Sequence, residues 1–294
     1  MTSILYDAPG PVARRRELIG SVVGVLLLLL VIGAGVRYSA QQGLFTAERW
    51  DVLYDPPKNQ DAADVWRSIA VNGLGATLRA AAVAAPVALA LGLLLAVWRT
   101  VRSRVLRLPS LLIIELFRGL PVLLMMFFGL LAFGLSAFQA VVFGLVVYNM
   151  AIFAEILRAG LASLPKGQSE AAYAIGLTRF QTLFTILLPQ AVRTMLPSLI
   201  AQLVVLLKDS SLGFIVGYAE LLKSVQNNAQ YFGNDYFIAL FVVGAGVYLI
   251  INIALSSLAR WISRRTGPQQ GKVDPVVETE LSANTTGPGL TAGR

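Results

Sequence analysis

The sequence predicts an all-α integral membrane protein with six transmembrane helices. Of its 294 residues, 56% are hydrophobic and 14% are charged, whereas about 25% of an ordinary soluble domain is charged. Several apolar runs reach the roughly 20 residues that a helix needs to cross a bilayer. The runs are continuous and do not alternate between apolar and polar residues, which favours helices over a membrane β-barrel.

The residue types exclude several classes of chemistry. The chain contains no Cys and no His, which excludes Cys nucleophiles, His general bases and metal sites built from thiolates or imidazoles. The formal net charge of +8 would suggest nucleic acid binding in a soluble protein. Because the Lys and Arg stand between apolar runs, we assign this charge to membrane topology. We therefore expect the lipid bilayer as a partner, no nucleic acid and no metal site.

The first span is expected at 18–37, after an N-terminus at 1–17 that carries three arginines at 14–16. A cleaved signal peptide is the alternative. Its apolar region is only about 7–15 residues long, however, and the residues after this run form a poor cleavage site. An external loop is expected at 38–67. It contains five acidic residues: Glu48, Asp51, Asp55, Asp61 and Asp64.

Five further spans complete a helical domain that covers 68–262. The stretch from Gly119 to Ala154 carries no charge and is too long for one helix, so we place a break near 134–137. A tail rich in Gly, Thr, Ser and Pro at 263–294 is expected to be disordered. The second to sixth spans are expected at about 69–98, from Pro109 to the break, from the break to Leu157, at 189–207 and at 236–259.

Charge asymmetry predicts the orientation of the chain. Six spans place both termini on the same side of the membrane. That side also receives most of the Lys and Arg between spans, whereas those on the other side are few and are offset by acids. By the positive-inside rule, the N- and C-termini are therefore expected to be cytoplasmic.

The stretch between the fourth and fifth spans carries a spaced motif. Glu170, Ala171 and Ala172 are followed by Gly176 and by I-x-L-P ending at Pro189, which gives E-A-A-x3-G-x9-I-x-L-P. The residues before Gly176 favour a helix, Gly176 permits a turn that a residue with a Cβ resists, and Pro189 suits the first turn of the next helix. The motif predicts a short cytoplasmic helix whose small side chains permit close docking. A surface helix without a partner is the alternative.

With this spacing, the chain resembles the type I ABC-importer permeases, and in particular the group for polar amino acids such as histidine, glutamine, glutamate and arginine. Upstream, F-R-G-L-P at 117–121 is similar to the F-R-G-T-P of that group, with Leu120 where Thr is usual. The resemblance covers about 68–262 and implies a five-helix core to which the first span is added. Further shared motifs are E-I-x-R-A-G at 155–160, K-G-Q at 166–168, L-P-Q-A at 188–191 and L-K-D-x-S-L at 207–212.

The resemblance also implies partners and a mechanism. The segment 165–180, with Glu170, Ala171, Ala172 and Gly176, would be the coupling helix that sits in a cleft of a cytoplasmic ABC ATPase dimer. Two permease chains, identical or sister chains, would form a pathway that opens alternately to each side. An extracytoplasmic binding protein would deliver the amino acid, with glutamate or a related one favoured, across a bacterial plasma membrane.

The same resemblance implies that the chain is not an enzyme. It contains no G-x4-G-K-[ST] loop, so ATP phosphates must be bound by another polypeptide. We expect no catalytic residue and no bound cofactor here, with ATP and Mg on the ATPase. A transporter driven by an ion gradient and a membrane-anchored structural protein are the rival classes, but neither requires the E-A-A spacing.

Ionisable residues inside predicted spans are candidates for function. Glu115 and Arg118 stand three residues apart, as do Glu155 and Arg158. Each pair can therefore meet on one face of a helix. We expect both to be structural or gating pairs.

The end of the fifth span suits a zwitterionic substrate. Lys208, Asp209 and Ser211 offer a cation, an anion and a hydroxyl group, and Asn149 is a further candidate for the substrate pathway. For Lys208 the alternative is that its ammonium reaches the membrane interface. For Asn149 the alternative is a hydrogen bond between helices.

Overall fold

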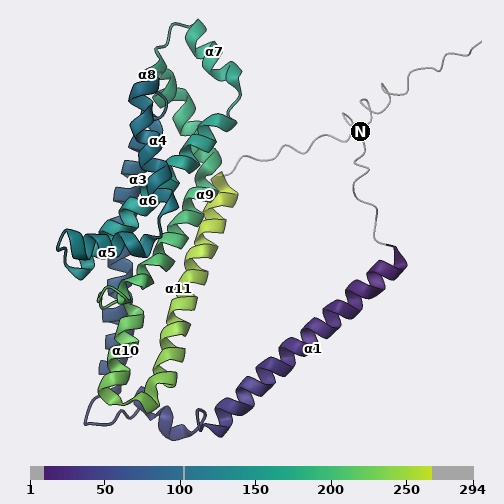
Figure 1. Cartoon of the computed structure of the whole chain (residues 1–294), viewed down its shortest axis with the longest axis vertical. Helices are drawn as coiled ribbons and strands as arrows, with labels where there is room; N and C mark the ends of the chain where they lie inside the picture. The colour runs from purple at the N-terminus through teal and green to yellow at the C-terminus, as the bar shows by residue number, and fades with distance from the viewer. Residues whose placement is uncertain (1–9, 102, 267–294) are drawn as a thin grey trace, which may run out of the picture. The chain divides into compact units, whose positions relative to one another are not determined.

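The structure, a computed structural model, describes residues 10–101 and 103–266, and these residues form helices and turns without a strand (Figure 1). Within this described part, five helices are long and apolar enough to span a membrane, or six when a bent pair counts as one span. The predicted all-α membrane class is confirmed. The tail expected to be disordered lies, from residue 267 on, outside the described residues, and 263–266 continue the last helix.

The chain forms two compact units, and α3 (Leu74–Trp98) and α11 (Phe237–Thr266) contribute to both. The first unit comprises residues up to 80 with 211–251, and the second comprises 81–210 with the chain from 252 on. Further elements of the first unit are α1 (Pro11–Gln41), η1 (Ala47–Arg49), η2 (Asp51–Leu53), α2 (Ala62–Trp66), η3 (Arg67–Gly73), most of η5 (Ser210–Phe214), α10 (Leu221–Phe232) and η6 (Asn234–Tyr236). The second unit adds α4 (Arg104–Gly119), α5 (Val122–Ala132), α6 (Ala137–Ser163), α7 (Lys166–Ala174), α8 (Arg179–Gln181), η4 (Thr182–Leu187) and α9 (Leu188–Asp209).

Helix α1 contains the expected first span and extends it at both ends. None of its residues is buried, and the 18-residue core of the helix is strongly apolar. Its apolar residues lie all round the helix and not on one face. That distribution suits a helix surrounded by lipid.

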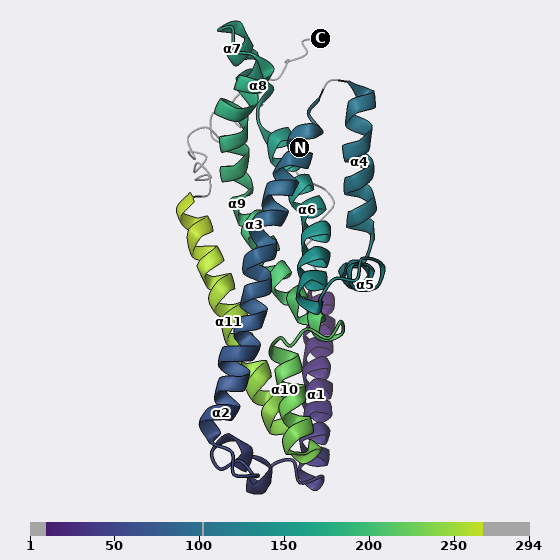
Figure 2. The same cartoon turned by 90° about the vertical axis from the view of Figure 1, so that its left-hand side faces the viewer.

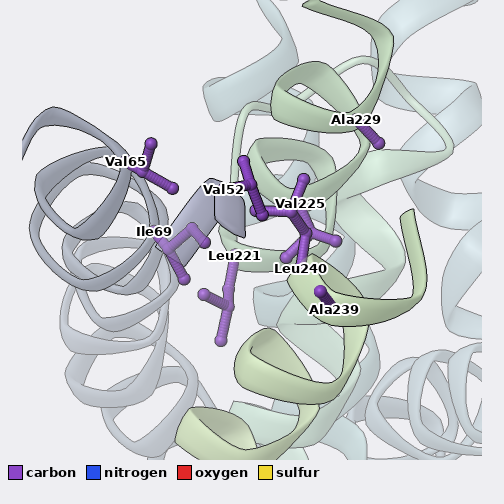
Figure 3. Close-up of a cluster of buried hydrophobic side chains, with 8 residues drawn as sticks. All are labelled: Val52, Val65, Ile69, Leu221, Val225, Ala229, Ala239 and Leu240. Atoms are coloured by element: carbon purple, nitrogen blue, oxygen red, sulfur yellow. The ribbon is translucent and has the colours of Figure 1, made fainter. Parts of the chain in front are cut away.

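The segment expected as an external loop is folded and contributes to the core of the first unit. Val52 of η2 and Val65 of α2 are buried with Ile69 of η3 against α10 and the start of α11 (Figure 3). Lys58 also donates a hydrogen bond to the carbonyl of Tyr231 and lies over its ring. The external position of this segment stays a prediction. Its fold was not expected, because composition reports polarity, whereas single apolar residues between the acids supply the contact.

Hydrogen bonds join η3 and α3 to α10 and the turn before it. The Tyr218 hydroxyl donates to the Ala76 carbonyl at 2.9 Å, and the Asn228 amide donates to the Ser68 hydroxyl at 2.8 Å. The Leu221 backbone N–H donates to the Thr77 hydroxyl at 3.2 Å. Such polar contacts hold helices together where lipid offers no alternative partner.

Helix α6 is the centre of the second unit, where it packs against α4, α5 and α9. Its glycines permit close approach, since a Cβ on Gly144 would lie 2.8 Å from the Met126 backbone nitrogen of α5. A Cβ on Gly160 would lie 3.1 Å from the Ala191 carbonyl oxygen of α9. Small residues at membrane helix interfaces allow backbones to approach in this way.

The third predicted span is bent by 102° between α4 and α5 (Figure 2). Leu120, between the two helices, adopts an extended conformation with φ −97° and ψ 140°, and Pro121 caps α5. Proline disfavours the helical conformation of the residue before it and supplies no N–H to the helix. The third span was expected without this bend, and the bent pair can still count as one span. The expected break near 134–137 is confirmed between α5 and α6.

The fifth predicted span starts earlier than expected. Helical backbone begins at Arg179 and continues through η4, which has π-helical geometry, into α9. Pro189 lies in the first turn of α9, as expected. The span was expected from Pro189, whereas the helix that contains it begins ten residues earlier, before the π-helical turn.

Matched glycine substitutions on α3 test the helix contacts. A Cβ on Gly92 would lie 2.9 Å from the Met150 carbonyl oxygen of α6, whereas a Cβ on Gly75 meets nothing within 4 Å. We expect Gly92→Ala to destabilise the protein by about 1–3 kcal/mol through overpacking. Gly75→Ala should stabilise it by about 0.5–1 kcal/mol, because alanine is favoured within a helix. Thermal unfolding of the purified chain in detergent measures both, and equal shifts would contradict the close contact.

Candidate functional site

The predicted cytoplasmic helix is α7, which follows α6 and lies beyond the ends of α6 and α9 in both views (Figures 1 and 2). It ends in a Schellman motif. The Leu177 N–H donates to the Ala172 carbonyl at 3.1 Å and the Gly176 N–H donates to the Tyr173 carbonyl at 3.0 Å. Gly176 has φ +83°, the left-handed conformation that this motif requires. The turn expected at Gly176 is confirmed.

The next helix begins immediately after this turn. The Thr178 hydroxyl accepts from the Gln181 N–H at 3.3 Å, and the Gln181 side chain accepts from the Thr178 N–H at 2.9 Å. This reciprocal capping box fixes the start of α8. The direction of α7 relative to α8 therefore depends on the backbone of Gly176 and Leu177.

Helix α7 has one buried and one exposed side. Ala172 is buried, and α7 packs on η4. Glu170 and Ala171 are exposed, and Ile175 at the end of the helix is 76% exposed. The motif thus presents a carboxylate, a small side chain and an apolar side chain to the outside.

A three-residue charge cluster lies between α3 and α6. Glu155 accepts from the Arg158 guanidinium at 2.6 Å, so the predicted pair is confirmed. Glu155 also accepts from Arg99, just after α3, at 2.8 Å. The sequence placed Arg99 in a basic loop and gave it no role, because only the fold brings α3 beside α6. One carboxylate thus binds Arg158 within α6 and joins α6 to the end of α3 through Arg99.

The second predicted pair is simpler. Glu115 accepts from Arg118 at 2.8 Å within α4. The Glu115 side chain is 55% exposed, against 25% for Glu155. Exposed pairs of this kind contribute little to stability.

Asn149 joins α6 to α9. Its side-chain oxygen accepts from the Gln202 amide at 2.8 Å, and its own amide donates to the Leu145 carbonyl at 2.8 Å. Asn149 is completely buried. The hydrogen bond between helices is confirmed, and Gln202 is the partner that the sequence did not reveal.

The other residues expected on the substrate pathway lie at the end of α9. Lys208 and Asp209 are its last two residues; Lys208 is exposed and Asp209 is half-buried. Ser211 follows in η5, within the first unit, where it lines a cavity of about 200 Å³.

Glu220 shares that cavity and was not predicted. It is fully buried, and its carboxylate accepts from the N–H groups of Leu222 at 3.0 Å and Lys223 at 2.9 Å at the start of α10. Burial raises the pKa of the Glu220 carboxyl, whereas these N–H groups oppose the rise. An acidic residue directly before an amphipathic run is the sequence signal that could have indicated this helix cap.

Comparison with known proteins places these features in a family. The family described as "Binding-protein-dependent transport system inner membrane component" matches residues 88–268, more than half of the chain. The chain belongs to this family. It is a permease subunit of an ABC importer and a multi-pass protein of the bacterial plasma membrane. Such permeases work with a separate ATPase subunit and with a binding protein.

Relatives extend the similarity over most of the helical domain. The chain is 44% identical over 211 residues to the "Glutamate transport system permease protein GluD" of Corynebacterium glutamicum, covering 69% of this chain and 77% of that protein. It is 35% identical over 200 residues to the "Probable glutamine ABC transporter permease protein GlnP" of Bacillus subtilis, covering 66% and 92%.

Solved structures agree with this assignment. A structure described as "an amino acid ABC transporter with histidines" superposes with a TM-score of 0.63 and 27% identity, covering 69% of this chain and 97% of that one. A transporter for the polysaccharide alginate gives a TM-score of 0.55 at 14% identity, covering 87% and 99%. That similarity shows the shared fold alone.

Removing single carboxylates tests the charge cluster. We expect Glu155→Gln to lower the stability of the protein by about 1.5–3 kcal/mol, since it removes charge-assisted hydrogen bonds to two guanidinium groups. Glu115→Gln is the control and should change stability by no more than about 0.5 kcal/mol, because that pair is exposed. Thermal unfolding in detergent at fixed salt compares the two. Similar losses would show that Arg99 adds nothing to the pair.

Proposed function

We propose that this chain imports glutamate or a related polar amino acid by alternating access, and that α7 is the helix that couples it to a cytoplasmic ATPase. The chain is a permease subunit of a polar amino acid importer. The proposal that the imported amino acid is glutamate is supported by the name of the 44% identical relative. The geometry of α7 is the single observation that carries the coupling role.

The shape of α7 supports transmission of motion. Nine residues form a helix that is closed at one end by the Gly176 turn, and α8 begins at Arg179 after its N-cap Thr178. A short helix held between two defined turns moves as a rigid piece with the helices on either side. ATPase motion at Glu170 and Ala171 would therefore reach both α6 and the helix from Arg179 to α9.

The assembly follows from the same proposal. A second permease chain, identical or a sister chain, completes the pathway, and both termini are cytoplasmic, as the charge asymmetry predicts. ATP and Mg bind to the ATPase dimer, and this chain carries no catalytic residue. An extracytoplasmic binding protein supplies the amino acid.

The substrate pathway is proposed to include Lys208 and Asp209, with Ser211 and Asn149 as further members. A zwitterion requires a cation for its carboxylate and an anion for its ammonium group, and Lys208 and Asp209 supply them on successive residues of α9. Asn149 would act through α9, because its side-chain oxygen is bonded to Gln202.

Substitutions in and after α7 test the coupling role. Gly176→Val forces a residue with a Cβ into a left-handed conformation, at a local cost of about 1–2 kcal/mol, and changes the direction of α7. Glu170→Lys reverses the exposed charge. We expect both variants to insert into the membrane and to lower ATP-dependent uptake by about 5- to 150-fold, the range of ordinary allosteric coupling. Glu170→Lys should also weaken retention of the ATPase during purification.

Gly167→Val is the control for the glycine substitution. Gly167 lies in α7 itself, and a Cβ there meets nothing within 4 Å. Its uptake should remain near that of the unmodified protein in membrane vesicles at matched permease levels. Normal uptake by both Gly176→Val and Glu170→Lys would mean that α7 is an ordinary surface helix.

Alanine substitutions test the substrate pathway. Lys208→Ala and Asp209→Ala should each lower uptake by about tenfold or more, since an interaction of a charge at membrane depth contributes a few kcal/mol. Retention of the ATPase should be unchanged, because the coupling helix is untouched. Uptake at the unmodified level in both variants would favour an interfacial position for the Lys208 ammonium group.

A further inference from the structure

Two adjoining cavities lie beside the coupling helix, where α3 ends and α8 begins. Their volumes are about 330 Å³ and 180 Å³, and Thr100, Arg179 and Leu183 line both. All the lining residues belong to the second unit. Because the two cavities share these three residues, they adjoin, and we call them together the Arg179 groove.

The two parts of the Arg179 groove differ in chemistry. The larger cavity is walled mainly by apolar side chains, and Trp98, Val101 and Phe180 are among the exposed large apolar residues of the protein. The smaller cavity adds Tyr173 of α7 to the Thr100 hydroxyl and the Arg179 guanidinium. Leu161, Leu183 and Leu187 complete the smaller cavity, so the groove is mainly apolar in its larger part and mixed in its smaller part, with Thr100 and Arg179 lining both.

Among the residues that the structure describes, Arg179 is the one charged residue that lines either cavity. It is exposed, and within the described part of the chain the ion pairs involve other arginines, namely Arg99, Arg118 and Arg158. The groove thus presents one positive charge that no carboxylate neutralises. A ligand that complements it carries one negative group and an apolar portion.

We propose that the Arg179 groove binds an anionic phospholipid, with the phosphate at Arg179 and Thr100 and an acyl chain along Trp98, Val101 and Phe180. The helix that contains the second span ends at Trp98, beside the groove, and we place the larger, mainly apolar part of the groove at the bilayer. Aromatic residues are enriched at this depth, and basic pockets on the cytoplasmic side bind anionic headgroups. This inference rests on the proposed cytoplasmic side of α7.

The position of the Arg179 groove connects a bound lipid to the coupling helix α7. Tyr173 lines the smaller cavity from α7, and Arg179 is the first residue of α8. A headgroup held there contacts both sides of the Gly176 turn. The bound lipid stabilises one direction of α7, so the coupling between ATPase and pathway depends on the content of anionic lipid.

Lipid retention by the purified permease–ATPase complex tests the proposal. Native mass spectrometry counts the molecules of phosphatidylglycerol or phosphatidylcholine that survive a detergent wash after equilibration with each lipid. Arg179→Gln should lower phosphatidylglycerol retention by about fivefold, the effect of one arginine near an anionic surface, and leave phosphatidylcholine unchanged. Arg179→Lys should keep most of the retention. Arg104→Gln, at an exposed arginine on α4 outside both cavities, is the control and should resemble the unmodified complex.

Several results would overturn the proposal. Equal phosphatidylglycerol retention in Arg179→Gln and the unmodified complex would exclude a lipid site here. Displacement of the lipid by inorganic phosphate alone would indicate a site for a free anion. Loss of the ATPase from Arg179→Gln with unchanged lipid retention would place a protein contact in the groove. Lipid retention is independent of the test of coupling. The Glu170→Lys variant should lose its ATPase and its uptake activity but retain the lipid.

Discussion

Close approach of helix backbones to α6 is the constraint on which the second unit depends. Lipid is as apolar as a leucine side chain, so helices in a bilayer gain little from hydrophobic burial and must gain from packing and polar contacts. Gly92 of α3, Gly144 and Gly160 supply the packing, since a Cβ at each would lie within about 3 Å of a neighbouring atom. Asn149 and Glu155 supply the polar contacts from the same helix.

The same helix also carries the proposed coupling device. Helix α6 ends at Ser163, and α7 begins at Lys166. A displacement of α7 is therefore transmitted to a helix that is already tied to α3 through Glu155 and to α9 through Asn149. The tight packing of α6 is therefore what allows it to transmit motion, because a loosely held helix would absorb the displacement of α7 locally.

The sequence predicted features whose cause is local. The apolar runs, the pairs three residues apart and the left-handed Gly176 all depend on neighbours within a turn or two. It did not predict the bond from Arg99 to Glu155, the Gln202 partner of Asn149 or the burial of Val52, because each joins residues far apart in the chain. The bend at Leu120 is an exception. The local signal of Pro121 was present, but Pro121 was placed within a single span and no bend was predicted.

The core of the first unit has a consequence for the boundaries of this protein. Val52, Val65 and Ile69 all precede residue 88, where the family similarity begins, yet they are buried against Leu221, Val225 and Leu240, which lie within it. A chain shortened to the shared region would leave those apolar side chains uncovered. The unit that folds therefore extends beyond the residues that match the family.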